Sequence, residues 1–228
     1  MLELVADGLW RARGEPLKFL AFRVPVCAYI VRLSTGGLWV YSPIELSPDL
    51  VAEVTALGSV DALVAPNEFH HLYFGAWQAH WPGARSYGVK GLVEKRPDLD
   101  FDVLLDEGTH DPWPGDIETL VFAGNRVLTE AFFFHHHSRT LVLADLMLNV
   151  DVRDQGLVAR AFARLNQVAH PDGGSSRLFR WGMKSRVAAR EAINRAIELA
   201  PERVVIAHGE GLHDDAVARL TEQFAWLV

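Results

Sequence analysis

Apolar and polar positions follow a strand pattern early in the chain, and turn residues divide that pattern. Residues 24–33 are rich in β-branched side chains, residues 34–37 (STGG) have the composition of a turn, and residues 38–44 resume the strand pattern. These segments predict a β-hairpin. Ser47 and Pro48 have the residue types of a helix cap and a first helical position, and Gly58 is typical of a helix end. A helix is therefore predicted between them.

The middle of the chain alternates between apolar strands and helical segments. A strand of the buried type at residues 61–66 precedes a loop and a helix that end at Pro82-Gly83, and residues 84–89 form the next strand candidate. Residues 91–115 hold several Pro, Gly and Asp residues and are predicted to be mostly loop. Three more strand candidates follow in close succession, at residues 117–123, 129–135 and 139–146.

The last third of the chain is mainly helical. Residues 152–180 start as a helix and break at residues 170–176 (HPDGGSS), residues 184–200 form a clear helix, and a strand at 203–210 precedes a final helix. A doubly wound fold would alternate strands and helices from the outset. Two β-led halves instead predict two sheets packed face to face with helices outside.

Composition and charge narrow the class of protein. The chain has 228 residues, half of them hydrophobic, which favours one globular domain over residues 1–228. The net charge is −7, and the basic cluster Arg177, Arg180, Lys184 and Arg186 is interpreted as a solvated helix face, so we expect no nucleic-acid partner. The single cysteine, Cys27, excludes an internal disulfide and a cysteine-rich zinc site.

The apolar runs are too short for a membrane span, and the first residues lack the apolar region of a signal peptide. We therefore expect a cytoplasmic protein without a membrane partner.

Candidate chemistry gathers where predicted strands end. Six of the ten histidines occupy three places, namely His70-His71, residues 135–137 and His208, and Asp145 follows the strand at 139–146. Ends of strands are where α/β folds build their sites. Imidazole and carboxylate together suit zinc, iron or manganese. The alternatives are structural, because the histidines can cap a helix or pack, and Asp145 can cap a helix or pair with an arginine.

The triple histidine and Glu130 are harder to interpret. In a strand His135 and His137 share one face and His136 lies on the other, so only one face can point at a given site. All three can equally belong to a hairpin turn. Glu130 precedes three phenylalanines and lies either at an exposed edge or in a site.

Five segments occur together in an order that resembles the metallo-β-lactamase-like superfamily. They are LWVYSP at 38–43, DALVAPNEFHHLYFGAW at 61–77, SRTLVLADL at 138–146, VVIAHGE at 204–210 and FAWL at 224–227. The strongest resemblance is to an uncharacterised bacterial branch whose domain has no assigned function. It implies an α/β fold, a four-layer αββα sandwich with its site along the common edge of two sheets. Typical members bind one or two zinc or iron ions and hydrolyse esters, amides or phosphodiesters.

The main histidine box of that superfamily, HxHxDH, reads PNEFHH here. His71 matches the last histidine of the box, and His70 falls where the aspartate belongs. Pro66 and Glu68 stand in place of the two leading histidines, with Asn67 between them. The resemblance therefore implies an altered metal site and makes a two-metal site improbable.

The other positions are partly retained. Asp145 matches the bridging aspartate and His208 the late histidine, while the middle histidine has no clean match and Glu130 lies in that stretch. The resemblance thus implies one ion held by some of His70, His71, Asp145 and His208, with Asn67, Glu130 and His137 as secondary candidates.

The function that follows is a metal-dependent hydrolase of a small substrate, using water activated by one zinc, iron or manganese ion. Asp145 is the expected catalytic residue, orienting that water or accepting its proton, and Tyr73 and Trp77 are expected to contact the substrate. The alternative is a non-catalytic relative that has lost the metal and binds a ligand in the old cleft through a hydrogen-bond network. The sequence leaves open whether the chain is an enzyme. Replacing His71 or Asp145 by alanine is expected to reduce metal content, and replacing His136 is not.

Overall fold

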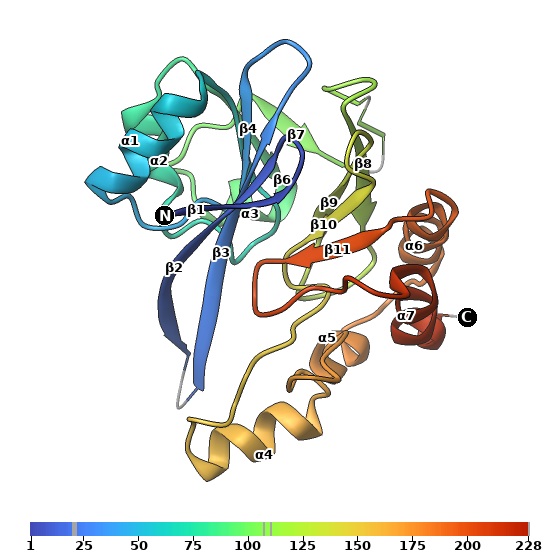
Figure 1. Ribbon diagram of the computed structural model, residues 1–228. Helices are drawn as coiled ribbons and strands as arrows, with labels where there is room; N and C mark the ends of the chain where they lie inside the picture. Colours follow the sequence, from blue (N-terminus) through green and yellow to red (C-terminus); the bar gives the residue numbers. More distant parts are fainter. Residues whose placement is uncertain (20–21, 107, 110, 228) are drawn as a thin grey trace.

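Two β-sheets pack face to face in the computed structural model, which describes residues 1–19, 22–106, 108–109 and 111–227 (Figure 1). Within these residues the first sheet has seven strands in chain order, β1 (Leu2–Ala6), β2 (Leu9–Phe19), β3 (Phe22–Arg32), β4 (Leu38–Tyr41), β5 (Val60–Ala65), β6 (Arg85–Val89) and β7 (Val103–Leu105). The second, likewise counted, has four strands in the order β11 (Arg203–Ile206), β10 (Thr140–Leu143), β9 (Glu130–His135) and β8 (Ile117–Phe122).

The predicted hairpin and first helix are confirmed. Strands β3 and β4 pair antiparallel around the turn at residues 34–37. In α1 (Pro48–Leu57) the Ser47 hydroxyl accepts a hydrogen bond from the backbone N–H of Leu50, Pro48 is the first residue, and Gly58 follows the end with φ of 156°. The cap satisfies one of the N–H groups that the first helical turn leaves without a partner.

Strands β4 to β7 run parallel, so each connection must cross back over the sheet. The first two crossings contain α1 and α2 (Phe74–His80), and α3 (Lys90–Lys95) lies in the third. Buried residues of the three helices, including Leu50, Trp77 and Leu92, pack in the same core as the first sheet. These helices form the layer outside that sheet.

The three phenylalanines of β9 show how the second sheet is covered on both faces. Phe133 packs against Trp39 and Tyr41 of the first sheet, with ring centroids 5.0 and 5.7 Å away. Phe132 and Phe134 lie in a second core that includes α6 (Val187–Glu198) and α7 (Ala216–Phe224). Because side chains alternate along a strand, β9 joins the sandwich core to the outer helices. The predicted four-layer αββα order is therefore confirmed.

Short elements account for most differences from the predicted pattern. The region 91–115, expected to be mostly loop, contains the end of α3 and strand β7, which are too short to show a hydrophobic period. The interrupted helical region resolves into α4 (Leu157–Leu165) and α5 (Arg177–Trp181), and a 3₁₀ turn, Ala225–Leu227, follows α7. Every helix in the described part of the chain is too short or too polar to cross a bilayer.

Candidate metal centre

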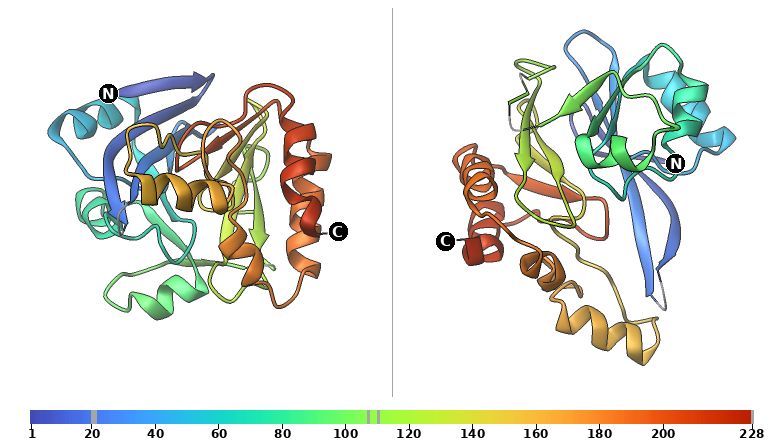
Figure 2. Two further views of the ribbon diagram at one scale, coloured as in Figure 1. Left: turned by 90° about the horizontal axis from the view of Figure 1, so that it is seen from below. Right: turned by 180° about the vertical axis from the view of Figure 1, so that it is seen from behind.

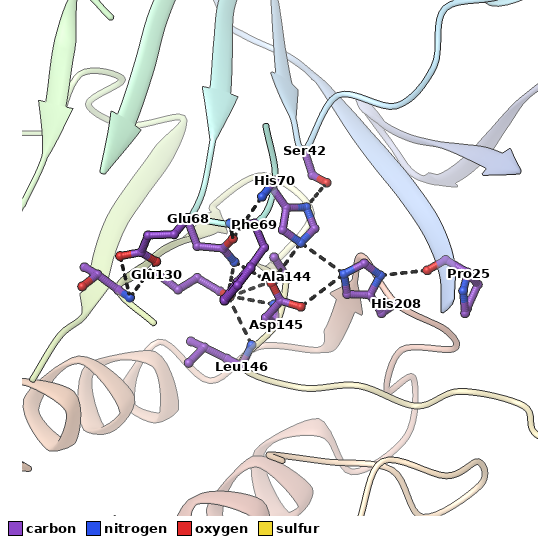
Figure 3. Close-up of polar contacts among 12 residues, drawn as sticks. Pro25, Ser42, Glu68, Phe69, His70, Glu130, Ala144, Asp145, Leu146 and His208 are labelled. Atoms are coloured by element: carbon purple, nitrogen blue, oxygen red, sulfur yellow. Dashed lines mark hydrogen bonds and ion pairs between the residues drawn. The ribbon is translucent and has the colours of Figure 1, made fainter. Parts of the chain in front are cut away.

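Three loops from the two sheets meet at one edge of the sandwich (Figure 3). His70 lies in the loop after β5, Asp145 follows β10, and His208 follows β11. Each loop leaves the carboxyl end of its strand, and β10 and β11 are parallel neighbours. The sandwich therefore brings together side chains that lie up to 138 positions apart in the chain.

The three side chains converge with their ligand atoms on one another. His70 Nε2 lies 3.1 Å from Asp145 Oδ2, and His208 Nε2 lies 3.2 Å from Asp145 Oδ1. The two Nε2 atoms are 3.1 Å apart. The side chains are 7–10% exposed, so the cluster is largely shielded from solvent. Together they are the group in the described residues that offers at least three ligand atoms within 4.8 Å of one another.

Outer hydrogen bonds orient both imidazoles. The Nδ1 atom of His208 lies 2.8 Å from the carbonyl oxygen of Pro25, and because a carbonyl only accepts, Nδ1 carries the hydrogen. The neutral ring then presents its Nε2 lone pair to the cluster, which is how metal-binding histidines are commonly held. His70 Nδ1 shares a hydrogen bond of 2.6 Å with the hydroxyl of Ser42, which can donate or accept.

The donor set fits one metal ion. Two imidazoles and a carboxylate suit zinc, iron or manganese. Tetrahedral coordination with bonds of about 2.0–2.1 Å separates neighbouring ligand atoms by about 3.3 Å. The observed separations of 3.1–3.2 Å are close to that spacing. The Nε2 lone pair of His208 faces the ligand atoms of His70 and Asp145. Because these atoms repel the lone pair, a proton or a metal cation is needed between the three side chains.

Asn67 holds two of the three ligand loops in place. Its Oδ1 accepts hydrogen bonds from the backbone N–H groups of Phe69 and His70, at 2.9 and 3.2 Å. Its Nδ2 donates to Asp145 Oδ2 and to Glu130 Oε2, both at 2.9 Å. The amide therefore fixes the His70 loop against the Asp145 carboxylate, and its position is that of a support for the cluster.

Glu130 anchors the loop that carries Asp145. Its carboxylate accepts from the backbone N–H groups of Ala144, Asp145 and Leu146 at 2.7–3.2 Å, in addition to the amide of Asn67. The side chain is completely buried. Burial and the neighbouring charge of Asp145 raise the pKa of Glu130 above its usual value, whereas the four hydrogen-bond donors favour the ionised form. The structure thus shows Glu130 as a support for the Asp145 loop, with its oxygens occupied.

The charges of the cluster depend on one another. Burial disfavours the Asp145 anion, yet the two histidines hold the pKa of this carboxyl far below its usual range. Burial also opposes the His208 cation, but the hydrogen bond and charge of Asp145 raise the pKa of His208 above its usual value. Burial lowers the pKa of His70. Asp145 is therefore ionised, and of the two rings His208 accepts a proton more readily.

Several residues predicted for the site lie elsewhere. His71 Nδ1 is 2.7 Å from Arg96 Nη1, outside the cluster, and burial lowers the pKa of His71. Trp77 is fully buried, with its indole N–H donating to the carbonyl of Ile44, because its apolar ring belongs to the core beneath α2. Tyr73 is partly exposed and directly precedes α2.

The triple histidine does not join the cluster either. His135 is buried, and its Nδ1 lies 2.7 Å from the hydroxyl of Ser138. His137 is exposed, with Nε2 2.9 Å from an Asp7 carboxylate oxygen. His136 begins the turn after β9. These residues serve the end of β9 and the turn to β10.

Sequence reasoning missed two members of the site. Ser42, directly after β4, has φ of 54°, a left-handed conformation uncommon for residues with a side chain. Its place after a buried strand was the available signal. The Pro25 carbonyl gives no signal of its own, because a backbone acceptor depends on the fold and not on the residue type.

A cavity of about 420 Å³ lies apart from the cluster. It is lined by residues of β1, β2 and β3 and of the segment around β11, and none of the three cluster residues contributes to it. Its charged side chains pair with each other, as Arg11 with Glu3 at 2.9 Å and Arg13 with Glu210 at 3.3 Å. The cavity is therefore not the opening of the candidate metal centre.

Comparisons with solved structures place this fold among metallo-β-lactamases. DIM-1 metallo-β-lactamase superposes with a TM-score of 0.67 at 14% identity, covering 100% of this chain and 96% of that one. A metallo-β-lactamase from Pontibacter korlensis gives 0.64 at 13% identity, covering 99% and 98%. The flavodiiron protein from Giardia intestinalis gives 0.69 at 9% identity, covering 100% of this chain and 59% of its own. At these identities the likeness concerns the fold.

The protein thus has the metallo-β-lactamase fold. Within that fold the chain belongs to the family described as Domain of unknown function (DUF4336), whose model matches residues 15–177. The match includes His70 and Asp145 and ends before His208. A search of curated proteins found no match.

Proposed function

We propose that the protein is a metal-dependent hydrolase of a small substrate, with one zinc, iron or manganese ion held by His70, Asp145 and His208. The observation that carries the proposal is the convergence of three ligand atoms from three loops at separations of 3.1–3.2 Å. The fold likeness to metallo-β-lactamases supports it. Residues 1–228 would act as one domain of this kind.

The remains of the histidine box favour one ion over two. Pro66 is buried and offers no donor side chain, and its carbonyl oxygen accepts the N–H of Ala131. The Glu68 carboxylate accepts from the N–H of Thr129 at 3.1 Å and is not a member of the cluster. Pro66 and Glu68, the positions that would complete a second set of metal ligands, therefore hold neighbouring backbone in place instead.

A bound ion would act as a Lewis acid and lower the pKa of a coordinated water to about 7. Three protein ligands leave a position open for that water, as in catalytic zinc sites. The lowered pKa of Asp145 keeps this carboxyl ionised and makes it a weak base, so orienting the water suits it better than accepting a proton. Tyr73 remains a proposed substrate contact, whereas Trp77 would support the cleft from the core.

A second candidate is a binding protein without catalysis. The specific observation in its favour is that His208, Asp145 and His70 can satisfy one another by hydrogen bonds, with the proton on His208. The edge of the sandwich would then bind a small ligand, and adding a metal ion would not change the affinity for that ligand.

The test is hydrolysis of a chromogenic carboxylic ester and a chromogenic phosphodiester by protein loaded with zinc, iron(II) or manganese. We expect turnover that a chelator removes and the same ion restores, and that Asp145→Asn lacks. Asn125→Ala is the matched control, since Asn125 bonds to the Phe179 carbonyl away from the cluster. Absence of ion binding, together with absence of turnover of either ester class, would favour the binding protein.

A further inference from the structure

Large apolar side chains are exposed on α4 and α5. Their exposed fractions are 81% for Leu157, 75% for Val158, 68% for Leu165, 49% for Leu178 and 82% for Trp181. Scattered exposed leucines are common, but several large apolar side chains exposed on two helices that follow each other in the chain indicate an interaction surface. We call these residues, together with the half-exposed Phe162, the α4–α5 surface.

Helix α4 turns its small side chains inward and its large ones outward. Ala159 and Ala163 are buried in a small core with Phe22 and Val152. At 100° per residue, the large residues of α4 cover a separate sector of the helix from these alanines. Helix α4 therefore packs on the protein through small alanines and through Phe162, whose ring centroid lies 6.2 Å from that of Phe22, while Leu157, Val158 and Leu165 stay exposed.

The two helices form one surface. The backbone N–H of Arg177, the first residue of α5, donates to the carbonyl of Asn166, directly after α4, at 3.2 Å. The Arg177 guanidinium donates to the carbonyl of Leu165. Both helices lie on the face seen from below in Figure 2, and α4 is the outermost element there.

The charge of this region is opposite to that of the rest of the protein. Residues 157–187 contain six basic residues and one acidic residue, Asp172, a net charge of +5 in a chain of net −7. The remaining residues therefore carry −12. The six are Arg160, Arg164, Arg177, Arg180, Lys184 and Arg186, and none forms an ion pair with a carboxylate of the described residues.

We propose that the α4–α5 surface docks the protein on the surface of an anionic lipid bilayer. Interfacial helices combine an apolar face with arginines and lysines beside it, and tryptophan is favoured at the interface. Basic side chains gain about 1 kcal/mol each near an anionic membrane. Nucleic acid fits less well, because its interfaces are polar and the exposed leucines would gain nothing there. The proposal concerns peripheral attachment, departs from our expectation of no membrane partner, and does not depend on the metal centre.

Sedimentation with vesicles tests the proposal. We expect the protein to bind vesicles of equal parts phosphatidylglycerol and phosphatidylcholine at low salt, and to bind phosphatidylcholine vesicles far less. Arg160→Gln with Arg164→Gln should weaken binding roughly 25-fold, about fivefold per charge. Leu157→Ser with Leu165→Ser should weaken it more than about tenfold, because buried leucine is strongly stabilising. Trp fluorescence should shift to shorter wavelength on binding, and Trp181→Phe should lose most of the shift.

Matched controls are Lys90→Gln and Leu104→Ser, which change exposed residues elsewhere and should bind like the parent. Asp145→Ala should also bind like the parent, which separates this proposal from the metal hydrolase. Because the substituted residues are exposed, the variants are expected to fold like the parent, and circular dichroism checks this. Absence of binding to anionic vesicles at low salt would overturn the proposal. So would a dimer in solution that Leu157→Ser with Leu165→Ser dissociates, because a second copy would then cover the surface.

Discussion

Two groups of histidines in this protein behave in opposite ways. His70 and His208 are 138 positions apart, yet their ring centroids lie only 4.9 Å from each other. His135 and His137 are close in the chain, yet their ring centroids are 6.2 Å apart and each bonds to a different residue. The comparison teaches that convergent strand ends, and not the local density of histidines, build the site.

The two groups of histidines differ in the structural elements on which they lie. The ligand residues follow β5, β10 and β11, whose ends meet at one edge of the sandwich. The triple histidine spans the end of β9 and the tight turn into β10. A turn directs successive side chains into different surroundings, so one of these rings is buried and another is exposed.

The largest expected effect comes from removing the shared carboxylate. Asp145→Ala would leave the imidazoles of His70 and His208 facing each other. The negative charge that holds the two rings, and that would bind the ion, would be gone. We expect metal affinity to fall by more than about a hundredfold, beyond the loss typical of residues that only support a ligand. Equilibrium dialysis against zinc measures this. Unchanged affinity would move the ion to another part of the molecule.

A smaller loss is expected for the residue that supports two ligand loops. Asn67→Ala removes the amide that joins the His70 loop to Asp145 and Glu130. Metal affinity should fall about 10- to 100-fold, the usual range for such a support. Asn125→Ala is again the control. A loss equal to that of Asp145→Ala would indicate that Asn67 itself is a ligand.

The other histidine group should control stability and not metal. Burial lowers the pKa of His135 to about 4, below its ordinary value of 6.5. The unfolded chain therefore takes up a proton below pH 6.5 that the folded chain refuses until about pH 4. The folded protein should lose about 1–2 kcal/mol from this group between pH 7.5 and pH 5. Urea unfolding of parent and His135→Gln would show it as a weaker pH dependence in the variant, and equal pH dependence would contradict it.

The smallest effects are expected for histidines outside the cluster. His136→Ala should leave metal content unchanged, as the sequence predicted. His71→Ala, which the sequence expected to reduce metal content, should now also have little effect because the ring bonds to Arg96. Elemental analysis of the two variants decides this. Loss of metal in His71→Ala would contradict the observed geometry and support the match of His71 to the last histidine of the HxHxDH box.

Much of the fold was accessible from the sequence, because local patterns are strong there. The hairpin of β3 and β4, the capped helix α1 and the apolar run of β9 each have a local signal. The short α3 and β7 have none, since a few residues cannot display a period.

The site was accessible only in part. Order along the chain pointed to His70, Asp145 and His208, which the structure brings together. It could not separate His70 from the adjacent His71, because their side chains differ in direction, and direction is set by the tertiary fold. The acceptor at Pro25 and the bridging geometry of Asn67 depend likewise on contacts between distant segments.

Isothermal titration of metal-free, tag-free protein with zinc, iron(II) and manganese tests the central claim most directly. The account predicts that at least one of these ions binds at one per chain. The heat of binding should disappear in Asp145→Ala and persist in His136→Ala. Absence of binding by all three ions to folded protein, or binding that survives Asp145→Ala unchanged, would contradict it.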